Sequence, residues 1–180
     1  KRRRAIGVPT DTTKADQVEA MVGRTMEHFG GLNVLVNAAA VLIRTPPVAE
    51  VPETDWDATM EVNLKGTFLC CKYAIPAMLQ SAGGAIVNIA SLAGIHGYTT
   101  SVPYAVSKAG IIHLTTVAAA QYNPKGIRIN CIAPGSVDTP QPRGSSASAE
   151  ALERRIREHP LRRIGRPEEL AAVILFLASD

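Results

Sequence analysis

Short aliphatic runs alternate with longer segments of helical periodicity along this chain of 180 residues. The runs are apolar on both faces, which is typical of strands in a parallel sheet that helices cover on both sides. They span Ala5–Pro9, Val34–Ala39, Ala85–Ala90 and Ile127–Ala133. The alternation predicts an α/β fold in which a doubly wound parallel sheet is flanked by helices, as a single domain over residues 1–180.

Apolar spacing and capping residues predict the helices between these strands. The first helix follows a weak capping box at Thr13–Asp16 and ends at Gly30-Gly31. Its apolar stripe consists of Val18, Met21, Val22, Thr25, Met26 and Phe29. Further helices are expected to begin at the cap Thr54–Asp57, near Tyr104, at Leu152 and at Pro167. The stretch Gln141–Ala149 is rich in Ser, Gly and Ala and is interpreted as a mobile loop.

Charge and cysteine content narrow the possible functions. A net charge of +3 without aromatic residues in a basic patch gives no support for nucleic-acid binding, and no apolar run reaches the ~18 residues of a membrane span. The cysteines Cys70, Cys71 and Cys131 form neither a disulfide framework nor a metal-ligand spacing. We therefore expect a cytoplasmic protein without a metal site, a nucleic-acid partner or a membrane partner. The basic run Lys1–Arg4 is interpreted as a helix C-terminal turn, because the apolar segment of a signal peptide does not follow it.

Tyr104 and Lys108 carry the clearest chemical signal. Because they are four residues apart, they lie on one face of a helix. A nearby ammonium favours the phenolate and lowers the pKa of a phenol, which is ordinarily ~10. If the Ser91 hydroxyl holds a substrate oxygen, Tyr104 is suited to move a proton at a carbonyl or an alcohol. Asn37, Ser91 and Pro134-Gly135 stand at or just beyond expected strand ends, where a parallel sheet binds its ligands.

Taken in order, these motifs resemble those of the short-chain dehydrogenase/reductase family, of the kind that includes ketoacyl-carrier-protein reductases and alcohol or sugar dehydrogenases. The resemblance covers essentially the whole chain and consists of Asp11, Val36–Ala40, Val62-Asn63, Ser91, Tyr104–Lys108 and Pro134–Thr139. It implies an NAD- or NADP-dependent oxidoreductase that interconverts a secondary alcohol and a ketone. It also implies a homo-oligomer, a dimer or a tetramer, that pairs the helices headed by Thr54 and Tyr104.

The same resemblance implies roles for individual residues. Ser91 would polarise the substrate oxygen, Tyr104 would act as general acid/base, and Lys108 would hold the nicotinamide ribose and lower the pKa of the tyrosine. Asn63 would anchor a water molecule in a proton relay. The remaining cofactor contacts are expected from Asp11, Asn37, Ala38, Ala39, Pro134, Gly135, Val137 and Thr139.

Two departures separate the chain from the family pattern. Ala40 stands where the family usually has glycine. The strand with a glycine-rich pyrophosphate turn is missing, so the chain is interpreted as an incomplete version of the fold without its first two strands and its last strand. A second hypothesis is therefore a non-catalytic Rossmann-like fragment or subunit that keeps the fold and does not bind the cofactor.

Several candidate residues also have a purely structural interpretation. Asp11 fits a turn residue equally well. For Asn37, an amide that hydrogen-bonds a neighbouring strand is favoured, and a direct contact with the cofactor is the less favoured interpretation. Asn63 fits a buried amide that satisfies a backbone group. Cys70-Cys71 is assigned to the core. Three arginines have two interpretations, a solvated helix face or a contact with an anionic substrate or a cofactor phosphate. They are Arg162, Arg163 and Arg166.

Overall fold

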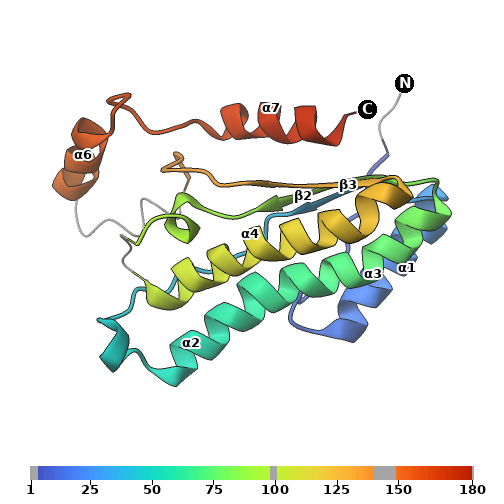
Figure 1. Cartoon of the computed structure of the whole chain (residues 1–180), viewed down its shortest axis with the longest axis horizontal. Helices are drawn as coiled ribbons and strands as arrows, with labels where there is room; N and C mark the ends of the chain where they lie inside the picture. The colour runs from blue at the N-terminus through green and yellow to red at the C-terminus, as the bar shows by residue number, and fades with distance from the viewer. Residues whose placement is uncertain (1–3, 98–100, 140–148, 180) are drawn as a thin grey trace.

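A three-stranded parallel sheet organises the protein (Figure 1). The computed structural model describes residues 4–97, 101–139 and 149–179. Within these ranges the strands run in the order β1 (Val34–Asn37), β2 (Gly84–Ile89) and β3 (Ile127–Ile132). The central strand β2 pairs in parallel with both neighbours, so the carboxyl ends of all three strands lie at one edge. Three of the four predicted strands and the predicted fold class are therefore confirmed.

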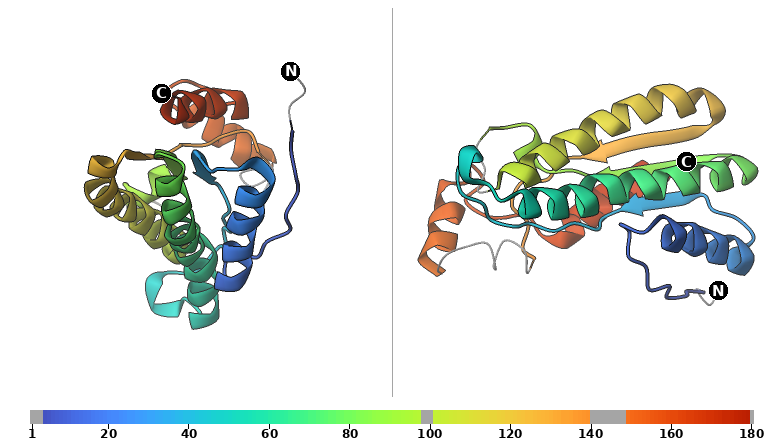
Figure 2. Two further views of the ribbon diagram at one scale, coloured as in Figure 1. Left: turned by 90° about the vertical axis from the view of Figure 1, so that its right-hand side faces the viewer. Right: turned by 90° about the horizontal axis from the view of Figure 1, so that it is seen from below.

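The prediction of a first strand over Ala5–Pro9 is wrong. These residues form no strand, and no strand of the described residues pairs with them. The segment instead runs beside α1 (Ala15–Phe29), where the Arg4 guanidinium donates to the His28 carbonyl oxygen at 2.9 Å (Figure 2). An extended segment becomes a strand only when a neighbouring backbone supplies hydrogen bonds. Arg4 is not helical either, and the rest of the basic run lies outside the described residues.

The first helix, α1, confirms the predicted apolar stripe, with Val18 and Val22 buried. Gly30 ends the helix in the left-handed conformation at φ 79°, which suits glycine. The predicted capping box does not form, since the residue at the helix start is Lys14 and its side chain makes no capping bond. The turn before the helix is closed by Asp11, whose carboxylate accepts hydrogen bonds from the backbone and hydroxyl of Thr13.

A long helical rod follows the loop after β1. It consists of α2 (Glu53–Met60), a π-helical segment (Glu61–Lys65) and α3 (Gly66–Gln80). The predicted cap at Thr54–Asp57 is wrong, because Pro52 precedes the first helical residue and places Thr54 inside the helix. The π-helical segment carries the fully buried Asn63, and such wide turns occur frequently at functional sites.

Helices cover both faces of the sheet. The rod and α4 (Val102–Tyr122) lie on one face, α1 packs against α3, and α7 (Pro167–Ala178) lies on the opposite face (Figures 1 and 2). The helix α6 (Ala149–Glu158) precedes α7 and begins three residues before the predicted start, Leu152. Most of the stretch interpreted as a mobile loop lies outside the described residues.

The core lies between the sheet and the rod. Its largest fully buried apolar side chains are Met78, Ile86, Ile111 and Ile127. The predicted core cysteines Cys70-Cys71 are both buried, and desolvation raises the pKa of the Cys71 thiol to about 12. No helix of the described residues is long and apolar enough to cross a membrane.

Candidate active site

Ser91 lies at the carboxyl edge of the sheet, two residues beyond β2. Its Oγ accepts a hydrogen bond from the backbone of Ala93 at 3.2 Å and so begins the short helix η3 (Leu92–Gly94). The backbone of Leu92 donates to the Pro134 carbonyl oxygen at 2.9 Å, which joins this turn to the segment after β3. The turn that begins at Ser91 is therefore hydrogen-bonded through Leu92 to Pro134, in another of the predicted site segments.

Tyr104 and Lys108 lie on one side of α4, as their spacing predicts. The Lys108 Nζ is 5.5 Å from the centre of the Tyr104 ring and donates to the Ile89 carbonyl oxygen at 2.8 Å. Ile89 is the last residue of β2, so the ammonium reaches the same strand end that leads to Ser91. Lys108 is only 3% exposed, and this burial lowers the pKa of its ammonium to about 8.

Gly94 allows η3 to pack directly on α4. A Cβ built on Gly94 would lie 2.6 Å from both the Lys108 carbonyl carbon and the Ala109 nitrogen, closer than real Cβ atoms approach. Only a residue without a side chain lets the Ser91 turn come this close to the Lys108 backbone. Sequence reasoning missed Gly94, although its place three residues after Ser91 was a usable signal.

The Asn63 side chain connects the loop after β1 to the helix of Tyr104. Its Oδ1 accepts from the Val41 backbone at 2.8 Å, and its Nδ2 donates to the Val41 carbonyl at 3.0 Å and to the Ser107 Oγ at 3.1 Å. The Ser107 hydroxyl in turn donates to the Tyr104 carbonyl at 2.8 Å. The structural interpretation of Asn63 is confirmed, and its role in a proton relay stays a prediction.

Asn37 begins a buried chain of hydrogen bonds that crosses the sheet. Its Nδ2 donates to the Asn88 Oδ1 at 2.8 Å, and the Asn88 Nδ2 donates to the Thr115 Oγ1 at 2.9 Å. The two asparagines lie opposite each other on β1 and β2. The strand-bridging interpretation of Asn37 is therefore confirmed. Asn88 was missed, although a lone amide within an aliphatic strand marked it.

Asp11 lies apart from these groups. Its carboxylate accepts from the Thr13 backbone at 2.9 Å and from the Thr13 Oγ1 at 2.8 Å, and these bonds lower the pKa of Asp11. It makes no hydrogen bond to Asn63, Ser91 or Tyr104 in the part of the chain that the structure describes. The turn interpretation is confirmed, and its contact with a cofactor stays a prediction.

The segment after β3 is held by the turn that precedes α7. The Asp138 backbone donates to the Gly165 carbonyl at 2.8 Å, and the Gly165 backbone donates to the Ser136 carbonyl at 2.9 Å. Val137, a predicted cofactor contact, forms a parallel bridge with Gly165. Thr139, the last predicted contact, is half-buried at the end of this segment.

The residues at this edge suit the nicotinamide half of a dinucleotide. An ammonium has three donors, and Lys108 uses one of them on Ile89, which leaves two for ribose hydroxyls. Ala38 and Ala39 follow β1 directly and are exposed with small side chains that let a ligand approach the backbone. The described residues contain no glycine-rich turn between a strand and a helix that would hold a pyrophosphate.

Comparison with known proteins agrees with this geometry. Residues 1–180 match a protein family described as enoyl-(acyl carrier protein) reductase. The chain is 41% identical to cis-4-hydroxycyclohexanecarboxylate dehydrogenase of Sinomonas cyclohexanicum, over 98% of this chain and 70% of that protein. It is 39% identical to a 3-oxoacyl-[acyl-carrier-protein] reductase of Thermotoga maritima, over 94% of this chain and 68% of the relative.

A solved structure of ElxO with NADP bound superposes on the chain with a TM-score of 0.88 at 34% identity. The match covers 94% of this chain and 69% of that one, so the chain represents part of the full-length fold. The three-stranded parallel sheet and its flanking helices agree with a partial Rossmann-like fold. The chain belongs to the short-chain dehydrogenase/reductase family.

Proposed function

We propose that the protein interconverts a secondary alcohol and a ketone with NAD or NADP as the hydride carrier. The observation that carries the proposal is the cluster at the sheet edge, where a buried Lys108 ammonium lies 5.5 Å from the Tyr104 ring. Packing of η3 on α4 through Gly94 brings the Ser91 turn to the same place. The relatives named for alcohol oxidation and for oxoacyl reduction support the same reaction class.

A nicotinamide bound here would supply the hydride chemistry at the substrate carbon, and the residues of the chain would handle the proton and the orientation. The Ser91 hydroxyl donates a hydrogen bond to the substrate oxygen and orients it. In the oxidation direction, the Tyr104 oxygen takes the proton of the alcohol as the C–H bond breaks. The Lys108 ammonium stabilises the negative charge on the phenolate that begins this step, because the two groups share a poorly solvated site.

The cofactor would be held along the carboxyl edge of the sheet. Lys108 and Tyr104 would contact the nicotinamide ribose, and the backbone after β1 would line the adenosine side. The other proposed contacts are Asp11, Asn37, Ala38, Ala39, Pro134, Gly135, Val137 and Thr139. The similarity to a structure with NADP bound supports a dinucleotide, and both NAD and NADP remain candidates.

Replacing Tyr104 with Phe tests the proposal. General acid/base catalysis contributes about 10²- to 10⁴-fold, so Tyr104→Phe should reduce kcat at least tenfold while the protein stays folded. Tyr122→Phe is the matched control, because Tyr122 lies in the same helix and outside the site. Retention of more than a tenth of the rate by Tyr104→Phe would refute the assignment of the general acid/base.

A second candidate function is a non-catalytic fragment or subunit. It differs from the first candidate in one measurable property, which is the binding of NAD or NADP. Titration of the 180-residue chain with NADH and NADPH, followed by fluorescence, separates the two candidates. Saturable binding supports the oxidoreductase. Failure to bind, both here and in a chain extended at its N-terminus, supports the non-catalytic candidate.

We also propose a cytoplasmic homo-oligomer, either a dimer or a tetramer. Apolar side chains on the helices expected to pair are exposed, among them Phe68 on α3 and Val106 and Val117 on α4. Sedimentation velocity of the wild type and of Phe68→Glu tests this surface. A charge at the centre of a dimer interface should shift the protein to monomers.

A further inference from the structure

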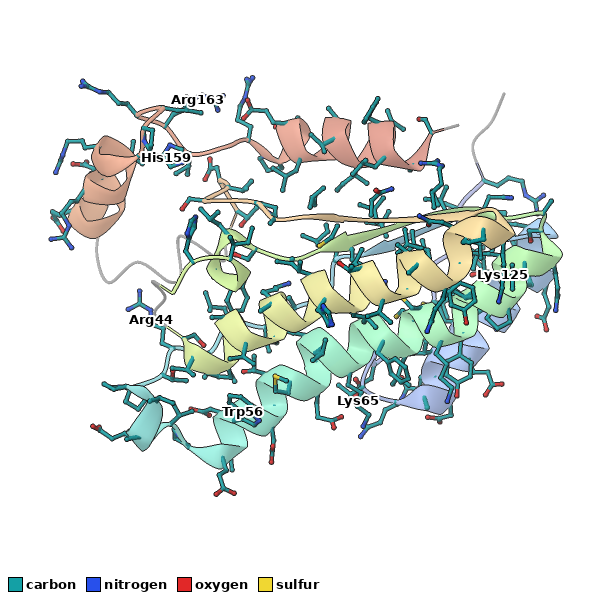
Figure 3. The ribbon with its side chains drawn as sticks, in the orientation of Figure 1. Arg44, Trp56, Lys65, Lys125, His159 and Arg163 are labelled. Atoms are coloured by element: carbon teal, nitrogen blue, oxygen red, sulfur yellow. The ribbon has the colours of Figure 1, made fainter. Side chains whose placement is uncertain are left out.

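His159 lies in the turn between α6 and α7, above the segment that follows β3 (Figure 3). The turn is anchored rather than loose, because Gly165 exchanges backbone hydrogen bonds with Ser136 and Asp138 at 2.9 and 2.8 Å. Within the turn, the Arg162 backbone donates a hydrogen bond to the His159 carbonyl oxygen at 2.7 Å, which fixes the backbone at the histidine. The position of His159 beside the segment that follows β3 is therefore a property of the fold.

The orientation of the imidazole is defined by its two nitrogens. The Leu161 backbone donates to the His159 Nδ1 at 3.3 Å. Since a backbone N–H can only donate, Nδ1 is the acceptor, and the proton of the neutral ring is on Nε2. The Nε2 lies 4.0 Å from the point where a Cβ on Gly135 would stand. An N–H donor thus faces the Pro134-Gly135 turn.

This donor lies beside the Pro134-Gly135 turn at the carboxyl edge of the sheet. Among the described residues, no hydrogen bond to the His159 Nε2 is formed. Gly135 follows Pro134, whose carbonyl accepts a hydrogen bond from the backbone of Leu92, the residue after Ser91. The imidazole therefore lies beside a segment that is hydrogen-bonded to the Ser91 turn.

The charges around the turn favour an anionic ligand. Arg163 is occupied by Glu169, with Nη2 and Oε1 2.7 Å apart, and Glu169 also accepts from the Arg166 backbone. Arg162 is exposed and forms no ion pair in the described part of the chain. Asp138, the nearby carboxylate on the β3 side, has an interaction of its own. Arg166 is likewise exposed and without an ion pair among the described residues, so the turn presents one N–H donor and two such cations.

We propose that His159 determines substrate specificity by donating its Nε2–H to a carboxylate on the substrate. The preferred substrate is then a secondary alcohol or ketone that carries an anionic group. This inference rests on the proposed oxidoreductase function and names its substrate class. A hydrogen bond to an ionised acceptor is stronger than one between neutral groups, which makes the donor selective.

Two probes that share a ring test the inference in the full protein. One is cis-4-hydroxycyclohexanecarboxylate and the other is the neutral cis-4-methylcyclohexanol. In His159→Leu, kcat/KM for the carboxylate should fall about 10- to 100-fold, mainly through KM, because a charge-assisted hydrogen bond is lost. The value for the neutral alcohol should change less than threefold. His159→Gln, which keeps an N–H donor, should recover part of the loss, and His28→Leu at the exposed end of α1 is the control.

A binding experiment makes the result independent of turnover. In ¹⁵N NMR, titration with cyclohexanecarboxylate should shift the His159 Nε2 resonance, and cyclohexanol should not. Equal losses of kcat/KM for both probes, or a raised KM for NADPH alone, would overturn the inference, because the histidine would then be structural or bind a cofactor phosphate. The lack of an Nε2 shift would overturn it as well. If the shift occurs without any Tyr104-dependent turnover, the anion site stands and the oxidoreductase proposal fails.

Discussion

Replacing Gly94 with Ala adds a single methyl group at the contact that positions Ser91. The new Cβ would lie 2.6 Å from the Lys108 carbonyl carbon and 3.0 Å from its oxygen. Ordinary van der Waals contact begins at 3.4 Å, so η3 and α4 must separate by about 0.8 Å. The atoms that clash belong to a helix backbone and cannot rotate away, so the separation displaces the Ser91 turn.

This displacement should affect catalysis more than stability. A misplacement of about 1 Å in an active site costs on the order of 10²-fold in rate, whereas an added methyl group in a packed region costs about 1–3 kcal/mol of the free energy of unfolding. We therefore expect Gly94→Ala to lower kcat about 100-fold while the protein stays folded and binds NADPH with unchanged affinity. Initial rates and urea unfolding measure the two effects separately.

Gly97→Ala is the control for this experiment. A Cβ on Gly97 meets nothing within 4 Å, so the substitution adds the same methyl group without a clash. It should leave kcat within about twofold of the wild type. The reasoning would be refuted if Gly94→Ala kept more than a third of the wild-type rate, or if the two variants lost equal activity.

Three further predictions follow from single contacts. Asn63→Ala leaves the Val41 amide and carbonyl without their partners and should lower the free energy of unfolding by about 3–5 kcal/mol; a loss below about 1 kcal/mol in urea unfolding would contradict this. Since burial lowers the pKa of Lys108 to about 8, the unfolded chain binds more protons between pH 8 and 10.5. As the pH rises across that range, the free energy of unfolding of the wild type should therefore increase by up to about 3 kcal/mol relative to that of Lys108→Met. A difference between the two proteins that stays constant with pH would disprove the lowered pKa. In Arg163→Ala, the pKa of Glu169 should rise from about 2 toward its ordinary 4.5 in a ¹³C NMR titration, because the ion pair at 2.7 Å is lost; an unchanged value would place the cause in the Arg166 backbone bond.

Patterns within one segment were predicted well because their causes are local. The stripe of α1 follows from helical periodicity, and its end at Gly30 follows from the freedom of glycine to adopt a left-handed conformation. The positions of Tyr104 and Lys108 on one side of α4 follow from their spacing. The aliphatic runs predicted β1, β2 and β3, because each is long enough to form a strand that is buried on both faces of a sheet.

Predictions failed where a second segment decides the outcome. Ala5–Pro9 has the composition of a strand and no strand beside it, and Arg4 ties the segment to the end of α1 instead. Thr54 has the chemistry of a cap, yet the chain enters α2 one residue earlier at Glu53. The partners of Asn63 come from a loop and from another helix, so no local pattern contains them.

The amino-acid sequence by itself determined the alternation of strands and helices and the family, and it singled out Ser91, Tyr104 and Lys108 as candidates for the chemistry. These depend on residue type and short spacing, which the chain carries at every step of folding. Only the tertiary structure decided that η3 touches the Lys108 backbone through Gly94, and that His159 faces Gly135. Both are close contacts between residues distant in the chain, and their geometry arises from packing rather than from periodicity.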